Sequence, residues 1–123
     1  MSLLVVDDEA VTRRVVIYTL KAIGITVIDA ADAASALRLA EQQEHQIDLM
    51  LVDINLPDMD GFTLMRQLHA IERVAHAPII AFTARNNADD EIQAREVGAV
   101  GFLYKPFSTQ ELRDLVTRYI HRG

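Results

Sequence analysis

Cysteine is absent from this sequence, and proline and glycine are scarce, with three and five residues among 123. Without cysteine the chain can form no disulfide, no thiolate metal site and no cysteine nucleophile, and it suits a reducing compartment. The scarcity of proline and glycine, with half of the residues apolar and 24% charged, argues against a fibrous or disordered chain. We therefore predict one globular domain over residues 1–123.

Long apolar runs and an excess of positive charge are also missing. No run approaches the ~20 apolar residues of a membrane-spanning helix, and no signal-peptide pattern opens the chain. The net charge is −6, and the ten arginines and two lysines are scattered rather than gathered in a stripe. We predict a cytoplasmic protein with no membrane partner and no direct nucleic-acid partner.

Short β-branched apolar runs alternate with amphipathic stretches along the chain. The apolar runs predict five strands, at residues 3–6, 26–28, 49–52, 78–82 and 100–103. The amphipathic stretches predict five helices, at residues 9–23, 32–43, 62–74, 88–97 and 109–121. Because the strands are apolar on both faces, they indicate an α/β fold with a doubly wound parallel sheet and helices on both faces.

Capping residues stand where these helices should begin and end. Gly24 and Gly98 follow predicted helices at positions that favour a left-handed cap, and Asp32 precedes one as an N-cap. Ser108 and Glu111 form an S-x-x-E capping box. The helix at residues 88–97 has few large apolar residues, so it is either a moving part or a solvated surface helix.

Four of the five predicted strands lead into polar residues. Asp7 and Asp8 follow the first strand, Asp53 the third and Thr83 the fourth, and Lys105 stands just after the fifth. The carboxyl ends of parallel strands share one edge of the sheet, where open α/β sheets bind their ligands. We expect these five side chains to converge there.

This set of side chains suits a metal ion and a phosphoryl group. Carboxylates are hard oxygen ligands for Mg²⁺, which keeps water ligands for a phosphate-bearing partner. An aspartate can also attack phosphorus and form an aspartyl phosphate, while a lysine and a hydroxyl neutralise the charge. Asp53, alone at the end of the third strand, is the predicted nucleophile, and Asp7 and Asp8 are assigned to the metal.

Each of these residues also has a purely structural interpretation. Asp8 could be the N-cap of the first helix, Thr83 could cap the approach to the fourth, and Lys105 could be a surface ion-pair partner. However, lysine occurs only twice against ten arginines, and its compact charge suits a phosphoryl oxygen. Because all these alternatives would have to hold at once on one edge, a binding site is favoured.

Four motifs surround these residues: VVDDE at residues 5–9, LVDINLPDMDG at 51–61, PIIAFTA at 78–84 and GFLYKPF at 101–107. Their order and spacing resemble the receiver domains of bacterial two-component signalling over the whole chain. The resemblance implies a flavodoxin-like sheet of strand order 2-1-3-4-5 and a signalling module rather than an enzyme. It implies phosphorylation by a histidine kinase or histidine phosphotransfer domain, with an unknown output domain or target protein.

The same resemblance assigns roles at the site. Asp53 would accept the phosphoryl group, and Asp8, Asp53 and the backbone carbonyl of Asn55 would bind Mg²⁺, or Mn²⁺ in its place. Asp7 would contribute to the metal site through water. Lys105 would contact the phosphoryl group.

Further implied roles concern the switch that follows phosphorylation. Thr83 would shift toward the phosphate and let Phe102 turn inward, remodelling the face made by the fourth helix, fifth strand and fifth helix. The alternative is that Phe102 is a permanently buried core aromatic. The Lys105–Pro106 peptide bond would be cis, a conformation whose free-energy cost is small only before proline. Asn55 and Arg85 occupy positions that tune phosphate lifetime in the family.

The first helix has a second apolar stripe, made of Val11, Tyr18 and Ala22. The stripe follows if the core-facing positions are Thr12, Val15, Val16, Thr19, Leu20 and Ile23. In receiver domains, which resemble one another in this respect, helical phosphodonor domains dock beside this helix. Val11 and Tyr18 are therefore predicted to contact the phosphodonor domain. The alternative is burial under the last helix.

Three other functions fit less well. A phosphatase with an aspartate nucleophile would want a second acid where Asn55 stands. A flavin-binding protein would want a hydroxyl-rich loop after the first strand, where Asp7, Asp8 and Glu9 would repel its phosphate. A receiver that no longer accepts phosphate would lack the aspartate, threonine or lysine, and all three are present.

Overall fold

The structure is a computed structural model that describes residues 1–42, 46–83 and 88–120. Its sheet has five parallel strands: β1 (Ser2–Val6), β2 (Thr26–Ala30), β3 (Leu49–Asp53), β4 (Ile79–Thr83) and β5 (Ala99–Tyr104). They lie in the order β2-β1-β3-β4-β5, which confirms the flavodoxin-like order. Gln43 and His121, the predicted ends of two helices, and Arg85 lie outside the described residues.

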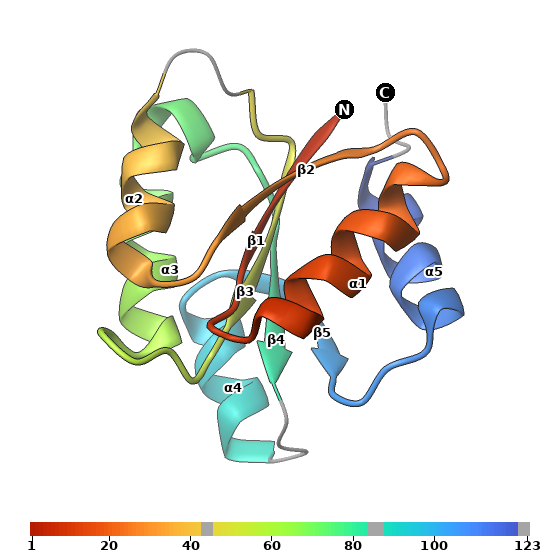
Figure 1. Cartoon of the computed structure of the whole chain (residues 1–123). Coiled ribbons are helices and arrows are strands. Elements are labelled where there is room, and N and C mark those ends of the chain that lie inside the picture. The colour runs from red at the N-terminus through yellow and green to blue at the C-terminus, as the bar shows by residue number, and fades with distance from the viewer. Residues whose placement is uncertain (43–45, 84–87, 121–123) are drawn as a thin grey trace.

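Five α-helices connect and follow the strands: α1 (Ala10–Lys21), α2 (Ala33–Glu41), α3 (Gly61–His69), α4 (Ala88–Glu96) and α5 (Thr109–Ile120). Helices α2 and α3 cover one face of the sheet and α1 and α5 cover the other (Figure 1). None of the helices in the described part of the chain has the length and apolarity to span a membrane.

Alternate strand residues feed two apolar cores, one on each face of the sheet. In β1, Leu4 and Val6 pack toward α2 and α3, whereas Leu3 and Val5 pack toward α1 and α5. All residues of β3 and β4 are buried. This burial on both faces explains why the strands appear in the sequence as continuous apolar runs.

The predicted helix at residues 62–74 is two helices in the structure. α3 ends at His69, and a 3₁₀ helix, η1 (Glu72–Val74), follows. Ile71 between them has an extended backbone, with φ −83° and ψ 113°. Val74 is buried in the core on that face, and Ile71 packs partly against it.

The predicted caps are present. Gly24 and Gly98 have φ of 84° and 104°, and the Ser35 N–H donates to Asp32 Oδ1 at 2.8 Å. In the capping box, the Glu111 N–H donates to Ser108 Oγ at 3.0 Å and the Ser108 N–H donates to Glu111 Oε1 at 3.1 Å. The alternative interpretation of Asp8 as the N-cap of the first helix is wrong, because Glu9 occupies the N-cap position of α1.

Two of the predicted core positions of α1 are wrong. Val16, Thr19 and Leu20 are buried, but Val15 and Ile23 are 37% and 41% exposed. Ile23 lies beyond the end of α1, in the turn toward β2, and Val15 borders a surface groove instead of the sheet.

Candidate functional site

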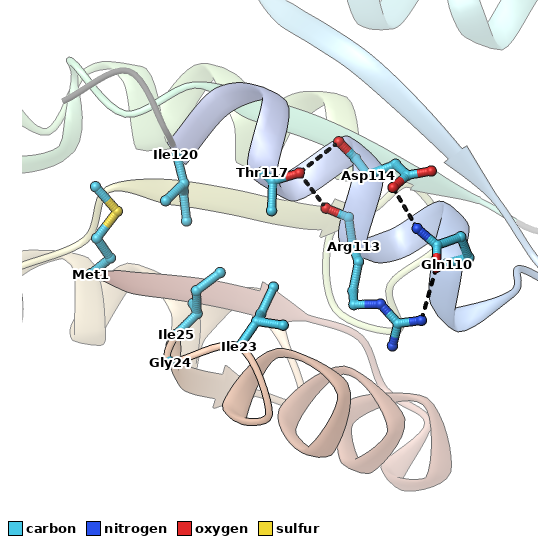
Figure 2. Close-up of a pocket in the computed structure, with 9 residues that line it drawn as sticks. All are labelled: Met1, Ile23, Gly24, Ile25, Gln110, Arg113, Asp114, Thr117 and Ile120. Carbon is cyan, nitrogen blue, oxygen red and sulfur yellow. Dashed lines mark hydrogen bonds between the residues drawn. The ribbon is translucent and has the colours of Figure 1, made fainter.

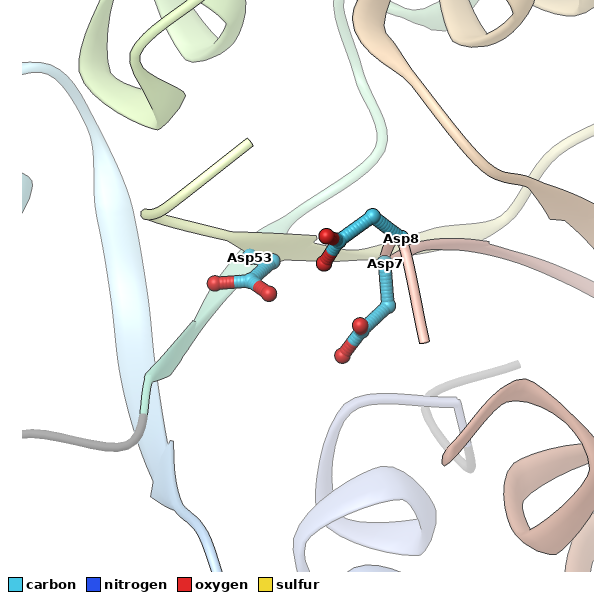
Figure 3. A group of neighbouring side chains, drawn as sticks. All are labelled: Asp7, Asp8 and Asp53. Atoms are coloured by element: carbon cyan, nitrogen blue, oxygen red, sulfur yellow. The ribbon is translucent and has the colours of Figure 1, made fainter. Parts of the chain in front are cut away.

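The carboxyl edge of the sheet brings together the three predicted carboxylates. Asp53 ends β3, and Asp7 and Asp8 follow β1, the neighbouring strand. One oxygen of each carboxylate lies within 4.8 Å of the others (Figure 3). Asp7 and Asp53 are buried, and Asp8 is exposed. The site is therefore partly open to solvent on the side of Asp8.

Lys105 places one ammonium group among these acids. Its Nζ lies 2.5 Å from Asp7 Oδ2, 3.1 Å from Asp53 Oδ2 and 3.2 Å from Glu9 Oε1. Burial alone would lower the pKa of Lys105, but the hydrogen bond and charge of Asp7 and the charge of Asp53 outweigh it and raise the pKa. Lys105 therefore stays charged and offsets the repulsion between the two buried carboxylates.

Asp53 is held through both carboxylate oxygens. Oδ1 accepts the Asn55 N–H at 2.8 Å, and Oδ2 accepts from Lys105 at 3.1 Å. Burial raises the pKa of Asp53, and the negative charge of Asp7 adds to this, while the Asn55 N–H and Lys105 act in the opposite direction. Added positive charge at this edge would therefore favour the ionised, nucleophilic form of Asp53.

Both carboxylate oxygens of Asp7 have a partner. Oδ1 accepts the Glu9 N–H at 2.8 Å. Oδ2 is buried and pairs with the ammonium group of Lys105, whose Nζ lies 2.5 Å away. The charge of Lys105 therefore compensates the buried carboxylate of Asp7.

Thr83 and Phe102 lie on the adjoining strands. Thr83 ends β4, is 1% exposed, and accepts the Lys105 N–H on its backbone oxygen at 2.8 Å. Phe102 in β5 is half-buried against the core, with the Arg95 guanidinium carbon of α4 4.9 Å from its ring centroid. Phe102 is therefore not the fully buried core aromatic of the alternative interpretation. The Lys105–Pro106 bond is cis, as the resemblance implied.

Two residues that support the site were missed from the sequence. A Cβ on Gly61 would lie 2.5 Å from both the Asp53 carbonyl oxygen and Ile54 Cα, so only glycine lets α3 start this close to β3. The glycine that follows the N-cap Asp60 was the available clue. Arg13 donates to the Asp7 backbone oxygen at 2.8 Å, a contact that no sequence pattern indicates.

A groove of about 430 Å³ opens beside the site. Val11 and Val15 of α1 line it together with Pro106 and Phe107, and Lys105 is at its border with the acidic cluster. Val11 is 70% exposed and Tyr18 is 71% exposed, so the alternative prediction that they are buried under the last helix is wrong.

A second cavity, of about 440 Å³, lies at the amino edge of the sheet (Figure 2). Met1, the turn at residues 23–25 and one side of α5 line it. None of the predicted site residues belongs to it.

Known proteins match this chain along most of its length. A family model described as the response regulator receiver domain matches residues 3–117. The chemotaxis protein CheY of Pseudomonas aeruginosa is 32% identical over 123 residues, which cover 99% of this chain and 98% of that protein. The aerobic respiration control protein ArcA of Escherichia coli is 35% identical over 98% of this chain, but the match spans only 50% of ArcA.

Solved structures agree with these matches. The chemotaxis protein CheY4 of Vibrio cholerae superposes with a TM-score of 0.90 at 31% identity, covering 97% of this chain and 98% of that one. The receiver domain of a sensor histidine kinase from Pseudomonas aeruginosa has a TM-score of 0.86 at 34% identity, covering 98% and 97%. That structure has a magnesium ion coordinated in its active-site cleft.

Proposed function

We propose, because the chain belongs to the response regulator receiver domain family of two-component systems, that Asp53 is its phosphoacceptor. Phosphorylation of an aspartate is the mechanism of this family, and a receiver is a signalling module rather than an enzyme. The observation that supports the assignment most is the placement of Asp53. It is 3% exposed at the end of β3, 3.1 Å from Lys105 and within the cluster of Asp7 and Asp8.

The proposed reaction is transfer of a phosphoryl group from a phosphohistidine. An Asp53 oxygen attacks phosphorus, the phosphorus–nitrogen bond breaks, and the imidazole leaves with the electron pair. Lys105 and the Thr83 hydroxyl then face the phosphoryl oxygens. Because Lys105 pairs with Asp7 and Asp53 beforehand, its charge is already at the place where new negative charge develops.

The donor set fits Mg²⁺, with Mn²⁺ as the alternative ion. The ligand atoms are hard oxygens from three carboxylates that lie within 4.8 Å of one another, and Asp8 is open to solvent. Asp8, Asp53 and the backbone carbonyl of Asn55 would hold the ion, with Asp7 acting through water. When bound, the ion would neutralise charge on the phosphoryl oxygens.

The proposed output is a change of the face formed by α4, β5 and α5. The phosphoryl group adds nearly two negative charges and three acceptor oxygens next to Thr83. Movement of Thr83 toward it would open room for Phe102, which now lies under Arg95 of α4. A changed face would alter the binding of an output domain or target protein.

The proposed phosphodonor is the helical domain of a histidine kinase or phosphotransfer protein, in the cytoplasm. Val11 and Tyr18 are exposed apolar residues on α1, and Val11 borders the groove beside Lys105. An exposed apolar surface next to a reactive centre suits the docking of a helix that delivers the phosphoryl group.

The phosphoacceptor is tested by incubating the chain with Mg²⁺ and a small-molecule phosphodonor, followed by intact-mass analysis. We expect a gain of one phosphoryl group that Asp53→Asn abolishes. No gain, or a gain that survives Asp53→Asn, would refute the assignment. Millimolar Mg²⁺ should also raise the melting temperature, and Asp8→Ala should remove that increase.

Docking is tested by comparing two phosphodonors. Val11→Glu with Tyr18→Glu should slow phosphotransfer from a phosphorylated kinase or phosphotransfer domain and leave the reaction with a small-molecule donor unchanged. Ile92→Glu on α4, where Ile92 is 56% exposed, is the matched control. Normal transfer from the protein donor would rule out this docking site.

A further inference from the structure

The carboxylate of Asp58 connects the loop after β3 to the first turn of α2. Its Oδ1 accepts the Ala33 N–H at 3.0 Å and its Oδ2 accepts the Ala34 N–H at 3.1 Å. The helix already has its own cap, because Asp32 accepts the Ser35 N–H at 2.8 Å. The two aspartates together satisfy the first three N–H groups of α2, which have no partner within the helix. The negative charge of Asp58 also faces the positive end of the helix dipole.

The same loop carries Asn55, whose backbone carbonyl is assigned to the metal. Asn55 pairs with Asp60 in an antiparallel bridge, and the Gly61 N–H donates to the Ile54 oxygen at 2.8 Å. These bonds close the base of the loop. The Asn55 N–H also donates to Asp53 Oδ1 at 2.8 Å, and Leu56 and Met59 of the loop pack partly against the core, whereas Asn55 itself is exposed. Asp58 makes the hydrogen bonds that attach this turn to α2.

We infer that Asp58 is a positioning residue for the metal site. By holding the turn of the loop against α2, it keeps the Asn55 carbonyl in place beside the carboxylates of Asp53 and Asp8. The inference rests on the proposed function, since it requires Asn55 to be a ligand. Residues that orient a metal ligand typically change metal affinity about 10- to 100-fold when mutated.

The test compares Asp58→Ala with Asp32→Ala by calorimetric titration of each folded protein with Mg²⁺ alone. Both variants remove a carboxylate cap from the same end of α2, so both should lower the melting temperature. Only Asp58→Ala removes the hydrogen bonds that join the loop of Asn55 to α2. We expect it to weaken Mg²⁺ binding about tenfold or more, and Asp32→Ala to leave the affinity unchanged.

Asp58→Asn provides a second variant that keeps the size of the side chain. Its amide is uncharged and has an NH₂ donor in place of one of the two oxygens that each accept one N–H, so we expect Mg²⁺ affinity between those of the unaltered chain and Asp58→Ala. If Asp58→Ala does not fold, the Mg²⁺ affinity of Asp58→Asn alone tests the inference.

The titration of the unaltered chain distinguishes a failure of the Asp58 inference from a failure of the proposed metal site. If that chain binds Mg²⁺ and the Asp58 variants bind it equally well, Asp58 only caps α2, and the inference is wrong while the metal site stands. If Asp32→Ala weakens binding as much as Asp58→Ala, the effect arises from the helix, and the inference is also wrong. If the unaltered chain binds no Mg²⁺, the proposed metal site and the inference fail together.

Discussion

Helices α3 and α4 are each nine residues long and pack on the same side of the sheet, but they are held differently. α3 contributes four buried side chains to the core, whereas among the described side chains of α4 only Ala94 is buried. α4 is instead attached by polar and aromatic contacts, from Glu91 to the Tyr104 hydroxyl and from Arg95 to the Phe102 ring. Several buried apolar side chains stabilise a helix more than single, partly buried polar contacts do. The comparison indicates that α3 fixes the site and that α4 can move at low cost.

The largest difference should appear when a side chain is shortened in each helix. Met65 of α3 is fully buried, so Met65→Ala should lower the free energy of unfolding by about 2–5 kcal/mol. Ile92 of α4 is 56% exposed, and Ile92→Ala should change the free energy of unfolding by no more than about 0.5 kcal/mol. Urea denaturation measures both. An equal loss in the two variants would contradict the comparison.

A smaller effect on stability, with a large effect on function, is expected at the start of α3. Gly61→Ala places a Cβ 2.5 Å from the Asp53 carbonyl oxygen, so it should cost about 1–3 kcal/mol and displace the backbone of Asp53, the proposed phosphoacceptor. Phosphorylation by a small-molecule donor should fall sharply. Gly101→Ala in β5 is the control, because its Cβ would lie 3.4 Å from the Tyr119 hydroxyl, near ordinary contact. Equal phosphorylation of the two variants would show that α3 does not fix the site.

Sequence patterns were sufficient for the parts of the molecule that depend on local chemistry. The strands could be predicted because β3 and β4 are buried on both faces and so consist of apolar residues. The acidic edge could be predicted because Asp7 and Asp53 follow strands directly, and parallel strands end at one edge.

The parts that could not be predicted depend on distant contacts. Asp58 bonds the N–H groups of residues 24 and 25 positions earlier in the chain, and in the sequence it is only a polar residue after a proline. The helical periodicity of α1 marked Val15 as a core position, yet its place at the edge of the α1 face leaves it 37% exposed. The break at Ile71 has an extended backbone and a contact with the core, neither of which local helix propensity describes.

The smallest expected effect concerns the attachment of α4. Burial raises the pKa of Tyr104 to about 12, and its hydrogen bond to Glu91 and the negative charge of Glu91 add to the shift. The folded state therefore favours the protonated hydroxyl. The stabilisation from this group is fully present below the ordinary tyrosine pKa of 10.0 and is lost as the pH rises from there through about 12.

Tyr104→Phe removes the hydroxyl and leaves the ring, so it should cost no more than about 1.5 kcal/mol at neutral pH. Its melting temperature should approach that of the unaltered chain as the pH rises from about 10 to about 12, because ionisation of Tyr104 abolishes the same bond. At neutral pH, hydrogen exchange should quicken for the amides of α4 and stay unchanged for those of α3. If α3 quickened equally, the hydroxyl would stabilise the whole domain, and the separate attachment of α4 would be disproved. Because a single partly buried contact of this size holds α4, the proposed phosphorylation would move α4 more easily than α3.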